Sequence, residues 1–288
     1  MLNNFKAKVF FADSRQLSKL LPEKSVDLIL TGPPYWNEVV YSSDDAQLSR
    51  INDYPEFLSE ISKCWDECST VIKDGGIVAI WVHDLIRRVN DGYQYIPFHS
   101  DIIKTFPKEL VLRNIYIWDR YLNKDRGELN SDKYGTRVQY ILIFQKEGSH
   151  SNNQKIEKAI QKLYWQPIWY KKTTPKLFGS MFLFKVCSEI IKPLRIYLND
   201  FSKNLQKLSI VQDEYSFSNY ITECPKDVSD MLISLFSSPG DLVLDPFAGS
   251  GTTLKSALSL RRHGIGIEVN KESMQAIKKK LSGMVTFL

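Results

Sequence analysis

The sequence predicts a doubly wound α/β fold, and three observations carry this prediction. Two short runs, Val26–Leu30 and Ile77–Val82, are apolar on both faces, as the strands of a buried parallel sheet are. A helix-like spacing of apolar residues, Tyr54–Ile72, lies between them. Near the carboxyl terminus a strand, an acidic residue, a glycine turn and a helix follow one another in Val243–Leu260. Strands that alternate with helices form an open sheet, which binds ligands at the carboxyl ends of its strands.

The other elements are predicted from the same signals, in chain order. The first strand is Lys8–Phe11, and a short helix follows over Arg15–Leu21. Asp74-Gly75-Gly76 is expected to end the helix that begins at Tyr54. The later elements are a helix at Pro97–Phe106, strands at Leu110–Trp118 and Val138–Gln145, and a helix at Glu223–Phe236. The polar stretch between those two strands, Asp119–Thr136, is a long loop of the kind that tends to be functional or mobile.

Length and composition describe a globular protein. The 288 residues suffice for one large α/β domain with an insertion, or for two domains. A content of 43% hydrophobic and 12% aromatic residues supports a packed core. The four cysteines are scattered, without a C-x-x-C pair or a histidine cluster, so we expect no metal site and a reducing, cytoplasmic location. The sequence shows no signal peptide and no apolar run of about 18 residues, so no membrane span is expected.

The segment Leu244–Thr253, with the sequence LDPFAGSGTT, is expected to bind a cofactor. Its strand ends at Asp245, and Gly249 and Gly251 allow a tight turn into the following helix. It lacks the third glycine of a dinucleotide fingerprint and the lysine of a P-loop. A carboxylate beside such a turn suits a ligand with an ammonium group and no phosphates, such as S-adenosylmethionine (AdoMet). The strand Gly264–Glu268 ends in a second acid at roughly the 20-residue spacing of a ribose-binding carboxylate. Taken alone, the turn is also compatible with a purely structural role.

Positive charge is concentrated in one middle segment. The net charge of the chain is +5, and Ser149–Thr222 holds eleven Lys/Arg and five Asp/Glu, which leaves 27 basic and 28 acidic residues elsewhere. Aromatic residues such as Trp165 and Trp169 are interleaved with these lysines. Basic side chains reach phosphates and aromatic rings stack on bases, so the segment is expected to face a polyanion. A small aromatic core with a solvated, lysine-rich rim is the alternative.

The end of the second strand carries the other chemical signal. Thr31-Gly32-Pro33-Pro34-Tyr35 continues from the strand, and its two prolines fix the backbone and leave only carbonyl acceptors. A rigid rim of acceptors followed by an aromatic ring suits a flat base that bears an amino group. Acceptors aimed at the N–H bonds favour a tetrahedral nitrogen with a localised lone pair, which can attack a methyl group directly. The base must leave the duplex first, at a cost of roughly a few kcal/mol. A strand-ending Pro-Pro turn is the alternative for this motif alone.

Together the two motifs resemble those of the DNA methyltransferases that modify cytosine N4 or adenine N6. Asp245–Thr253 resembles their AdoMet motif, DPFxGSGTT, and Thr31–Tyr35 resembles their catalytic motif, a polar residue followed by Pro-Pro-Tyr or Pro-Pro-Phe. The order of the motifs, catalytic first and AdoMet last, resembles the beta group. The resemblance covers most of residues 7–148 and 223–280. It implies a Rossmann-like AdoMet-dependent methyltransferase sheet, circularly permuted, with an inserted target-recognition region.

The resemblance also implies a division of the chain and a set of site residues. Residues 1–148 would form the catalytic half of the methyltransferase domain, 149–222 the DNA target-recognition region, and 223–288 the AdoMet-binding half. The catalytic residues would be Thr31, Gly32, Pro33, Pro34 and Tyr35, of which the last three would hold the flipped base. The cofactor-binding residues would be Asp13 near the adenine, Glu268 at the ribose and, around the methionine part, Asp245, Phe247, Gly249, Ser250, Gly251 and Thr252. Double-stranded DNA is the implied partner, with a cognate restriction endonuclease as a second one.

One residue departs from the family pattern. The family places Asp, Asn or Ser before Pro-Pro, where its oxygen accepts from the target amine, and this chain has Gly32. Three accounts are open: Thr31 or a water supplies the acceptor, the Pro33 carbonyl suffices with slower chemistry, or the protein binds DNA and AdoMet without efficient catalysis. Losing one such group typically costs ~10²–10³ in rate. The Thr-x-Pro-Pro-Tyr-Trp context is more similar to the cytosine-N4 members, with adenine N6 as the alternative.

Other chemistries are less well supported by the sequence. A cytosine-C5 enzyme needs a thiolate nucleophile, typically in a Pro-Cys pair, and the proline–cysteine neighbours here, Cys224-Pro225, are in the reverse order. His83-Asp84 at the end of a strand has the residue types of an acid–base pair, but direct methyl transfer needs no strong base, so we favour a packing role. An RNA or protein amide methyltransferase is a third alternative, since Pro-Pro-Tyr sites also occur in those enzymes.

Overall fold

The fold is described from a computed structural model of the 288-residue chain. The structure describes residues 5–37, 47–90, 92–119, 138–148, 168–170 and 224–288. The predicted loop Asp119–Thr136 and the predicted recognition region 149–222 therefore lie almost entirely outside the described residues. The chain divides into two compact units, Met1–Lys171 with Thr222–Leu288, and Lys172–Ile221. All the elements named below belong to the first unit.

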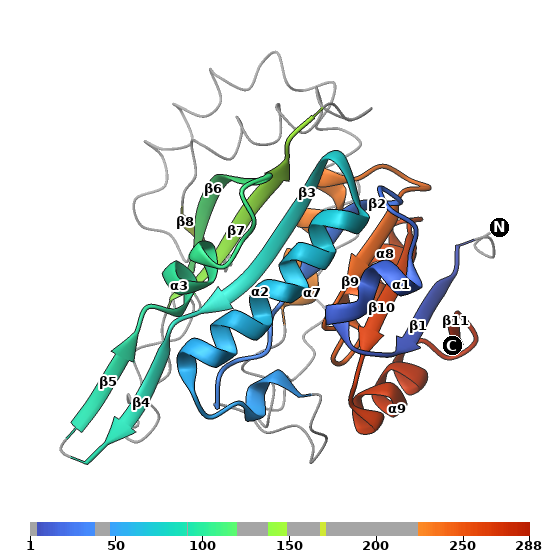
Figure 1. Ribbon diagram of the computed structural model, residues 1–288. Helices are drawn as coiled ribbons and strands as arrows, with labels where there is room; N and C mark the ends of the chain where they lie inside the picture. Colours follow the sequence, from blue (N-terminus) through green and yellow to red (C-terminus); the bar gives the residue numbers. More distant parts are fainter. Residues whose placement is uncertain (1–4, 38–46, 91, 120–137, 149–167, 171–223) are drawn as a thin grey trace, which may run out of the picture. The chain divides into compact units, whose positions relative to one another are not determined.

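The core of this unit is a mostly parallel sheet, nine strands wide in the described residues (Figure 1). Its strands, in spatial order, are β11 (Val285–Phe287), β1 (Ala7–Phe11), β10 (His263–Glu268), β9 (Leu242–Asp245), β2 (Val26–Thr31), β3 (Ile72–His83), β7 (Val138–Lys146), β6 (Leu110–Asp119) and β8 (Ile168–Tyr170). Neighbouring strands from β11 to β3 are parallel, whereas β7 runs antiparallel to both β3 and β6. The late strands β9 and β10 lie between the early strands β1 and β2. The predicted circular permutation of an α/β sheet is therefore confirmed.

Helices on both faces of the sheet explain why its strands are apolar throughout. The helices are α1 (Leu17–Leu20), α2 (Tyr54–Val71), α3 (Phe98–Lys104), α7 (Lys226–Phe236), α8 (Thr252–Ser259) and α9 (Lys271–Lys280). In β2, Ile29 packs in the buried cluster that includes α2, while Leu28 and Leu30 pack in the cluster that includes α7. Alternate side chains of a strand point to opposite faces, so α2 and α7 cover opposite faces of β2 (Figure 1).

The predicted helices and strands are confirmed to within a few residues at their ends. One difference is Arg15–Leu21, which divides into a 3-10 turn at Ser14–Gln16 and the short helix α1. Cys64 and Cys68 are fully buried on α2, and burial raises the pKa of both thiols. These two cysteines therefore pack in the core.

The prediction that Asp74-Gly75-Gly76 ends the α2 helix is wrong. The helix ends at Val71, and β3 begins at Ile72. Val26 of β2 pairs with Ile72 of β3, but Leu28 pairs with Ile77, so the register of the two strands shifts. The extra residues of β3 between Ile72 and Ile77 form an irregularity in the strand. Gly75 takes a left-handed φ of 71° there. The glycines serve a bulge in the strand and not a helix terminus.

A two-stranded hairpin was not predicted from the sequence. It consists of β4 (Leu85–Val89) and β5 (Gly92–Ile96) and begins two residues after the end of β3. Figure 1 shows it extending away from the end of that strand. Two consecutive arginines and a polar tip interrupt the apolar pattern of this stretch, so no strand signal was visible.

Five parallel strands end at the same edge of the sheet. Phe11, Thr31, His83, Asp245 and Glu268 are the last residues of β1, β2, β3, β9 and β10. This is the edge at which open α/β sheets bind their ligands. Among the described helices, none is both long and apolar enough to cross a membrane. The described ranges also contain no cluster of three or more His, Cys, Asp or Glu residues that could hold a metal ion.

Candidate cofactor and catalytic site

The two motifs predicted from the sequence meet at the carboxyl ends of β2 and β9. These strands are neighbours, with Leu28 paired to Val243. The hydroxyl of Thr31 donates a hydrogen bond of 2.6 Å to Oδ1 of Asp245, and both side chains are buried. The bond joins residues that lie 214 positions apart in the sequence. The proposed catalytic segment and the proposed cofactor turn are thus in direct contact.

Burial raises the pKa of Asp245 to about 6. The hydroxyls of Thr31 and Thr253 and the backbone N–H of Phe247 oppose this effect, because each donates to the carboxylate. These donors fix the orientation of the carboxyl group in a medium of low dielectric constant. Asp245 therefore titrates close to neutral pH and, once ionised, is a fixed acceptor for a cationic group.

Glu268 holds the glycine turn from the neighbouring strand end. Its Oε2 accepts the backbone N–H of Gly249 at 2.8 Å, and its Oε1 accepts that of Asn270 at 2.8 Å. Burial raises the pKa of Glu268 to about 7, although both backbone donors act in the opposite direction. The acid that was predicted to bind a ribose therefore shapes the glycine turn.

Gly249 and Gly251 have backbone conformations that favour glycine. Their φ angles are 50° and 79°, in the left-handed region. A Cβ atom at Gly251 would lie 3.1 Å from Cγ1 of Ile277, which is on α9. A Cβ atom at Gly249 would meet only the carbonyl oxygen of Phe247, at 3.7 Å. The turn is therefore packed against α9 on one side and open beside Gly249.

Lys280 is a residue of the turn that was not predicted from the sequence. Its Nζ donates to Oγ of Ser250 at 2.9 Å and to Oγ1 of Thr252 at 2.8 Å. It brings a positive charge to the two hydroxyls that the sequence assigned to the cofactor. Its place in the basic run Lys278–Lys280 gave no signal, because cations at the end of a helix are expected there for the helix dipole alone.

Asp13 lies at the end of β1, as predicted, but its carboxylate is already engaged. Oδ1 caps the following turn by accepting the N–H of Arg15 at 2.9 Å, and the guanidinium of Arg15 contacts both carboxylate oxygens. Arg15 also pairs with Glu60 of α2. The hydroxyl of Ser14 donates to the carbonyl of Pro246 and so ties the end of β1 to the AdoMet motif. Asp13 is thus part of an ion-pair network at the edge of the site.

The structure corrects the predicted place of the Tyr35 ring. The sequence indicated a ring presented to stack on a base, but Tyr35 is only 1% exposed. Its ring centroid lies 4.1 Å from that of His83 and 5.6 Å from that of Phe98. These partners come from β3 and α3, far away in the sequence, which is why the burial was not foreseen. Gly32 is not among the described glycines with a positive φ, so its backbone does not itself require glycine.

His83 and Asp84 are both buried, in agreement with the packing role favoured from the sequence. Asp84 accepts the hydroxyl of Tyr95 and the backbone N–H of His99, and its Oδ1 lies 2.5 Å from Nδ1 of His99. The His99 ring stacks on that of Tyr140, with centroids 3.8 Å apart. Asp84 therefore connects the hairpin, α3 and β7 behind the catalytic segment.

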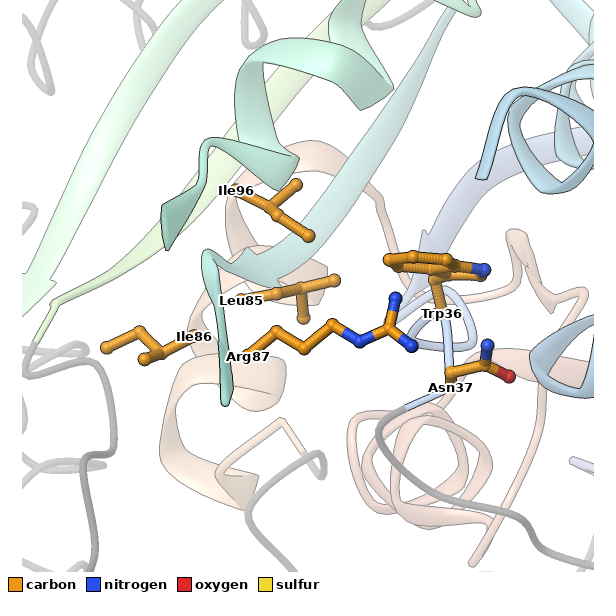
Figure 2. Close-up of a pocket in the computed structure, with 6 residues that line it drawn as sticks. All are labelled: Trp36, Asn37, Leu85, Ile86, Arg87 and Ile96. Atoms are coloured by element: carbon orange, nitrogen blue, oxygen red, sulfur yellow. The ribbon is translucent and has the colours of Figure 1, made fainter. Parts of the chain in front are cut away.

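A small pocket lies between the catalytic segment and the hairpin. Figure 2 shows the residues that line it, which are Trp36, Asn37, Leu85, Ile86, Arg87 and Ile96. The guanidinium of Arg87 lies over the Trp36 ring, 4.7 Å from its centroid. The Trp36 ring also packs against the ring of Tyr54, and their centroids are 4.7 Å apart. A cation over an indole face is an attractive contact, so it links the hairpin to the residue that follows Tyr35.

Comparison with known proteins agrees with this geometry. The N6/N4 methyltransferase family model, described as DNA methylase, matches residues 26–279. The type II methyltransferase M.MjaI of Methanocaldococcus jannaschii is 27% identical over 95% of this chain and 90% of its own length. The DNA adenine methyltransferase YhdJ of Escherichia coli is 26% identical over 95% of this chain and 82% of its own.

Solved structures share the fold. A putative DNA modification methylase from Thermus thermophilus, crystallised with S-adenosyl-L-methionine, has a TM-score of 0.64 at 24% identity and covers 98% of this chain and 99% of its own. The cytosine-N4-specific PvuII DNA methyltransferase has a TM-score of 0.59 at 17% identity, over 95% of this chain and 86% of its own. The family model spans most of the chain and contains both motifs. The chain therefore belongs to the N6/N4 family of DNA methylases.

Proposed function

We propose that this protein is a site-specific DNA methyltransferase that moves a methyl group from AdoMet to the exocyclic amine of a flipped base, with cytosine N4 as the target. The observation that carries the proposal is the hydrogen bond between Thr31 and Asp245, because it places the catalytic segment against the cofactor turn. A methyl donor held by one motif and an amine held by the other are then neighbours.

The residues of the turn fit AdoMet. Asp245 and Glu268 offer buried carboxylates to ammonium and hydroxyl groups, and the space beside Gly249 is open to close approach of a ligand. Lys280, held against the hydroxyls of Ser250 and Thr252, adds a positive charge that suits a ligand carboxylate. When bound, AdoMet supplies an electrophilic methyl group. The cofactor role of Phe247 and Gly251 follows from their place in the same turn.

The proposed role of Asp13 at the adenine involves its ion pair with Arg15. Its carboxylate is paired with Arg15, so we propose that the Asp13–Arg15 pair as a whole borders this end of the site. The bond from Ser14 to the Pro246 carbonyl keeps the pair in place beside the AdoMet motif.

The catalytic segment supplies fixed acceptors. Thr31 donates its hydroxyl proton to Asp245, so its role in the proposal is to hold the strand end. The Pro33 carbonyl, beyond Gly32 and kept rigid by Pro34, is proposed as the protein acceptor for the amine N–H. Tyr35 supports the rim from behind, through its buried contacts with His83 and Phe98.

The choice of base rests on the motif. Its Thr-x-Pro-Pro-Tyr-Trp context resembles the cytosine-N4 members of the family, and the cytosine-N4-specific PvuII enzyme shares the fold. Adenine N6 is the second candidate, because YhdJ, named an adenine methyltransferase, is similar over 95% of the chain. The names of several relatives as type II methyltransferases favour a cognate restriction endonuclease as a partner. The few, scattered cysteines favour a cytoplasmic location. Residues 149–222 are proposed to recognise the target sequence.

Transfer of a labelled methyl group tests the proposal. The full chain is incubated with methyl-tritiated AdoMet and, separately, mixed-sequence duplex DNA, total RNA and a protein extract. We expect label in duplex DNA, and loss of that label in Asp245→Ala. Label in RNA or protein but not in DNA would overturn the proposal in favour of the third alternative. Binding of AdoMet and DNA without transfer to any acceptor would show a DNA-binding relative without catalysis.

A further inference from the structure

The β4–β5 hairpin is a part of the ligand-binding edge that the proposed chemistry does not use. It follows β3 through Asp84, and its five residue pairs run from Leu85 with Ile96 at the base to Val89 with Gly92 at the tip. At about 3.4 Å per residue, it reaches about 15 Å beyond the sheet. Figure 1 shows that it extends away from the end of β3. Short exposed hairpins are marginally stable by themselves, so this arm depends on contacts with the rest of the protein or with a partner.

The base of the hairpin is firmly held. Leu85 and Ile96 are buried, and Asp84 accepts the hydroxyl of Tyr95. Asp84 also accepts the backbone N–H of His99, so hairpin and α3 share one buried carboxylate. The contact of Arg87 with the Trp36 ring adds a link to the catalytic segment. The arm is therefore fixed at its base and keeps a defined direction.

The two faces of the hairpin differ. Residues paired across an antiparallel ladder share a face, and successive residues alternate. Leu85, Arg87 and Ile96 line the pocket on the side of Trp36 (Figure 2). Tyr93 and Tyr95 alternate with Ile96 on β5 and lie on the other face, where they are 54% and 57% exposed. Two large rings side by side on a solvent-facing ribbon form a contact surface.

We infer that the β4–β5 hairpin is a DNA-binding arm, which lays its Tyr93–Tyr95 face against the duplex beside the modified base. The inference rests on the proposed function in one respect, that the substrate is DNA. A two-stranded ribbon fits the major groove, which is about 12 Å wide. Tyrosine rings offer large apolar faces for contact with bases and sugars.

The position and charge of the hairpin select duplex DNA as the occupant. Trp36 directly follows the Pro-Pro-Tyr rim and packs with Arg87, so a duplex that delivers a base to the rim passes alongside the arm. The stretch 85–96 contains two arginines and one acid, Asp91, and so carries net positive charge. This sign complements a phosphate backbone.

Duplex binding by the full chain tests the inference. Anisotropy of a labelled, mixed-sequence 30-base-pair duplex is measured for wild type, Tyr93→Ala and Tyr93→Phe at one fixed salt concentration. A second disruptive variant is Arg88→Glu, at the position paired with Tyr93 and so on the same face, where a negative charge opposes phosphates. The matched control is Met284→Ala, an apolar residue of similar exposure (49%, against 54% for Tyr93) beside β11, an edge strand of the nine-stranded sheet. AdoMet affinity by calorimetry and molar mass by sedimentation are recorded for each protein.

We expect Tyr93→Ala to weaken duplex binding about tenfold, as removal of a base-contacting aromatic does, and Arg88→Glu to weaken it by a similar factor through repulsion of the phosphates. Tyr93→Phe and Met284→Ala stay within twofold of wild type, and AdoMet affinity does not change. Duplex affinity within twofold of wild type for both disruptive variants would overturn the inference. So would a fall in molar mass with unchanged duplex affinity, which would identify the hairpin as a self-association surface.

The outcomes for the hairpin and for the proposed function are separable. If wild type transfers no methyl group but loses duplex affinity in Tyr93→Ala, the DNA-binding arm stands and the methyltransferase proposal fails. If wild type methylates DNA and Tyr93→Ala has an unchanged KM for DNA, the methyltransferase proposal stands and the arm fails.

Discussion

The hydroxyl of Thr31 donates a 2.6 Å hydrogen bond to the carboxylate of Asp245. Thr31 ends β2 and precedes the Pro-Pro-Tyr segment, whereas Asp245 ends β9 and opens the glycine turn. The permuted order of the strands makes these two ends neighbours in the sheet. The proposed site for the methyl donor and the proposed site for the amine are therefore coupled through a single buried bond.

Removing this bond should weaken both the fold and cofactor binding. In Thr31→Val the shape of the side chain is kept but Asp245 loses one donor, so its pKa should rise further above about 6. Hydrogen bonds to charged groups contribute about 1.5–3 kcal/mol, and the free energy of unfolding should fall by about 2 kcal/mol. Urea unfolding and an AdoMet titration at pH 7 measure the two effects. Thr31→Ser keeps the hydroxyl and serves as the control; equal AdoMet affinity in Val and Ser variants would contradict the coupling.

The raised pKa of Glu268 predicts the pH dependence of AdoMet binding. The carboxylate form accepts hydroxyl donors, and the pKa of about 7 means that this form is lost as the pH falls below neutrality. AdoMet affinity should therefore fall from pH 8 to pH 5.5, first through Glu268 and, below about pH 6, also through Asp245. Glu268→Gln should bind more weakly at pH 8 and lose much of this slope. A wild-type affinity that is constant over the range would count against a ribose contact by Glu268.

The same residue should make the ligand-free protein less stable as the pH rises. The folded pKa of Glu268, about 7, is above its ordinary value of 4.5, so the folded state binds more protons than the unfolded state between these values. Its contribution is therefore fully present below about pH 4.5 and is lost as the pH rises through about 7, by on the order of 3 kcal/mol. The difference in unfolding free energy between wild type and Glu268→Gln, measured at pH 5 and pH 8, isolates this effect. A difference that does not vary with pH would refute it.

Gly251 should be more sensitive to substitution than a glycine of the same conformation elsewhere. Gly251 and Gly283 have φ angles of 79° and 76°, so alanine costs about 1–2 kcal/mol of backbone strain at either position. At Gly251 the new Cβ also lies 3.1 Å from Ile277, whereas nothing lies within 4 Å at Gly283. Gly251→Ala should therefore be the less stable variant and the one that loses AdoMet affinity. Thermal unfolding and calorimetry compare them, and equal AdoMet affinities would exclude a cofactor role for the turn.

Gly32 should limit the rate of methyl transfer. Its backbone has no positive φ, so a side chain adds no left-handed backbone strain, and Gly32→Ser restores the acceptor that the family places before Pro-Pro. The value of kcat should rise by tenfold or more with an unchanged KM for AdoMet, since a lost group of this kind costs ~10²–10³. Gly32→Ala adds a Cβ without an acceptor and should give no gain. If serine lowers kcat or leaves it unchanged, the Pro33 carbonyl alone meets the need of the amine.

The strand skeleton could be predicted because buried parallel strands carry a strong local signal. Every residue of Val26–Leu30 is apolar except Asp27. The structure places helices on both faces of this strand. The two motifs were equally visible, since each is contiguous in the sequence. The prediction that Asp74-Gly75-Gly76 ends a helix was wrong because two glycines after a helix are compatible with both a helix end and a strand bulge. The pairing of β3 with β2 decides between the two.

The contacts between distant segments could not be predicted. The burial of Tyr35 depends on His83 and Phe98, and the position of Lys280 depends on how α9 packs against Gly251. The hairpin was missed because two consecutive arginines and a polar tip interrupt its apolar pattern. In each case the local sequence is compatible with several environments, and tertiary packing selects one of them.

Nucleoside analysis is the most direct test of the central claim, that the joined motifs transfer a methyl group to an exocyclic amine in DNA. The full chain is incubated with AdoMet and unmethylated mixed-sequence genomic DNA, which is then digested to nucleosides and analysed by mass spectrometry. The account predicts N4-methyldeoxycytidine that forms only when both AdoMet and active protein are present. N6-methyldeoxyadenosine would contradict the choice of cytosine, and the absence of any methylated nucleoside would contradict the central claim.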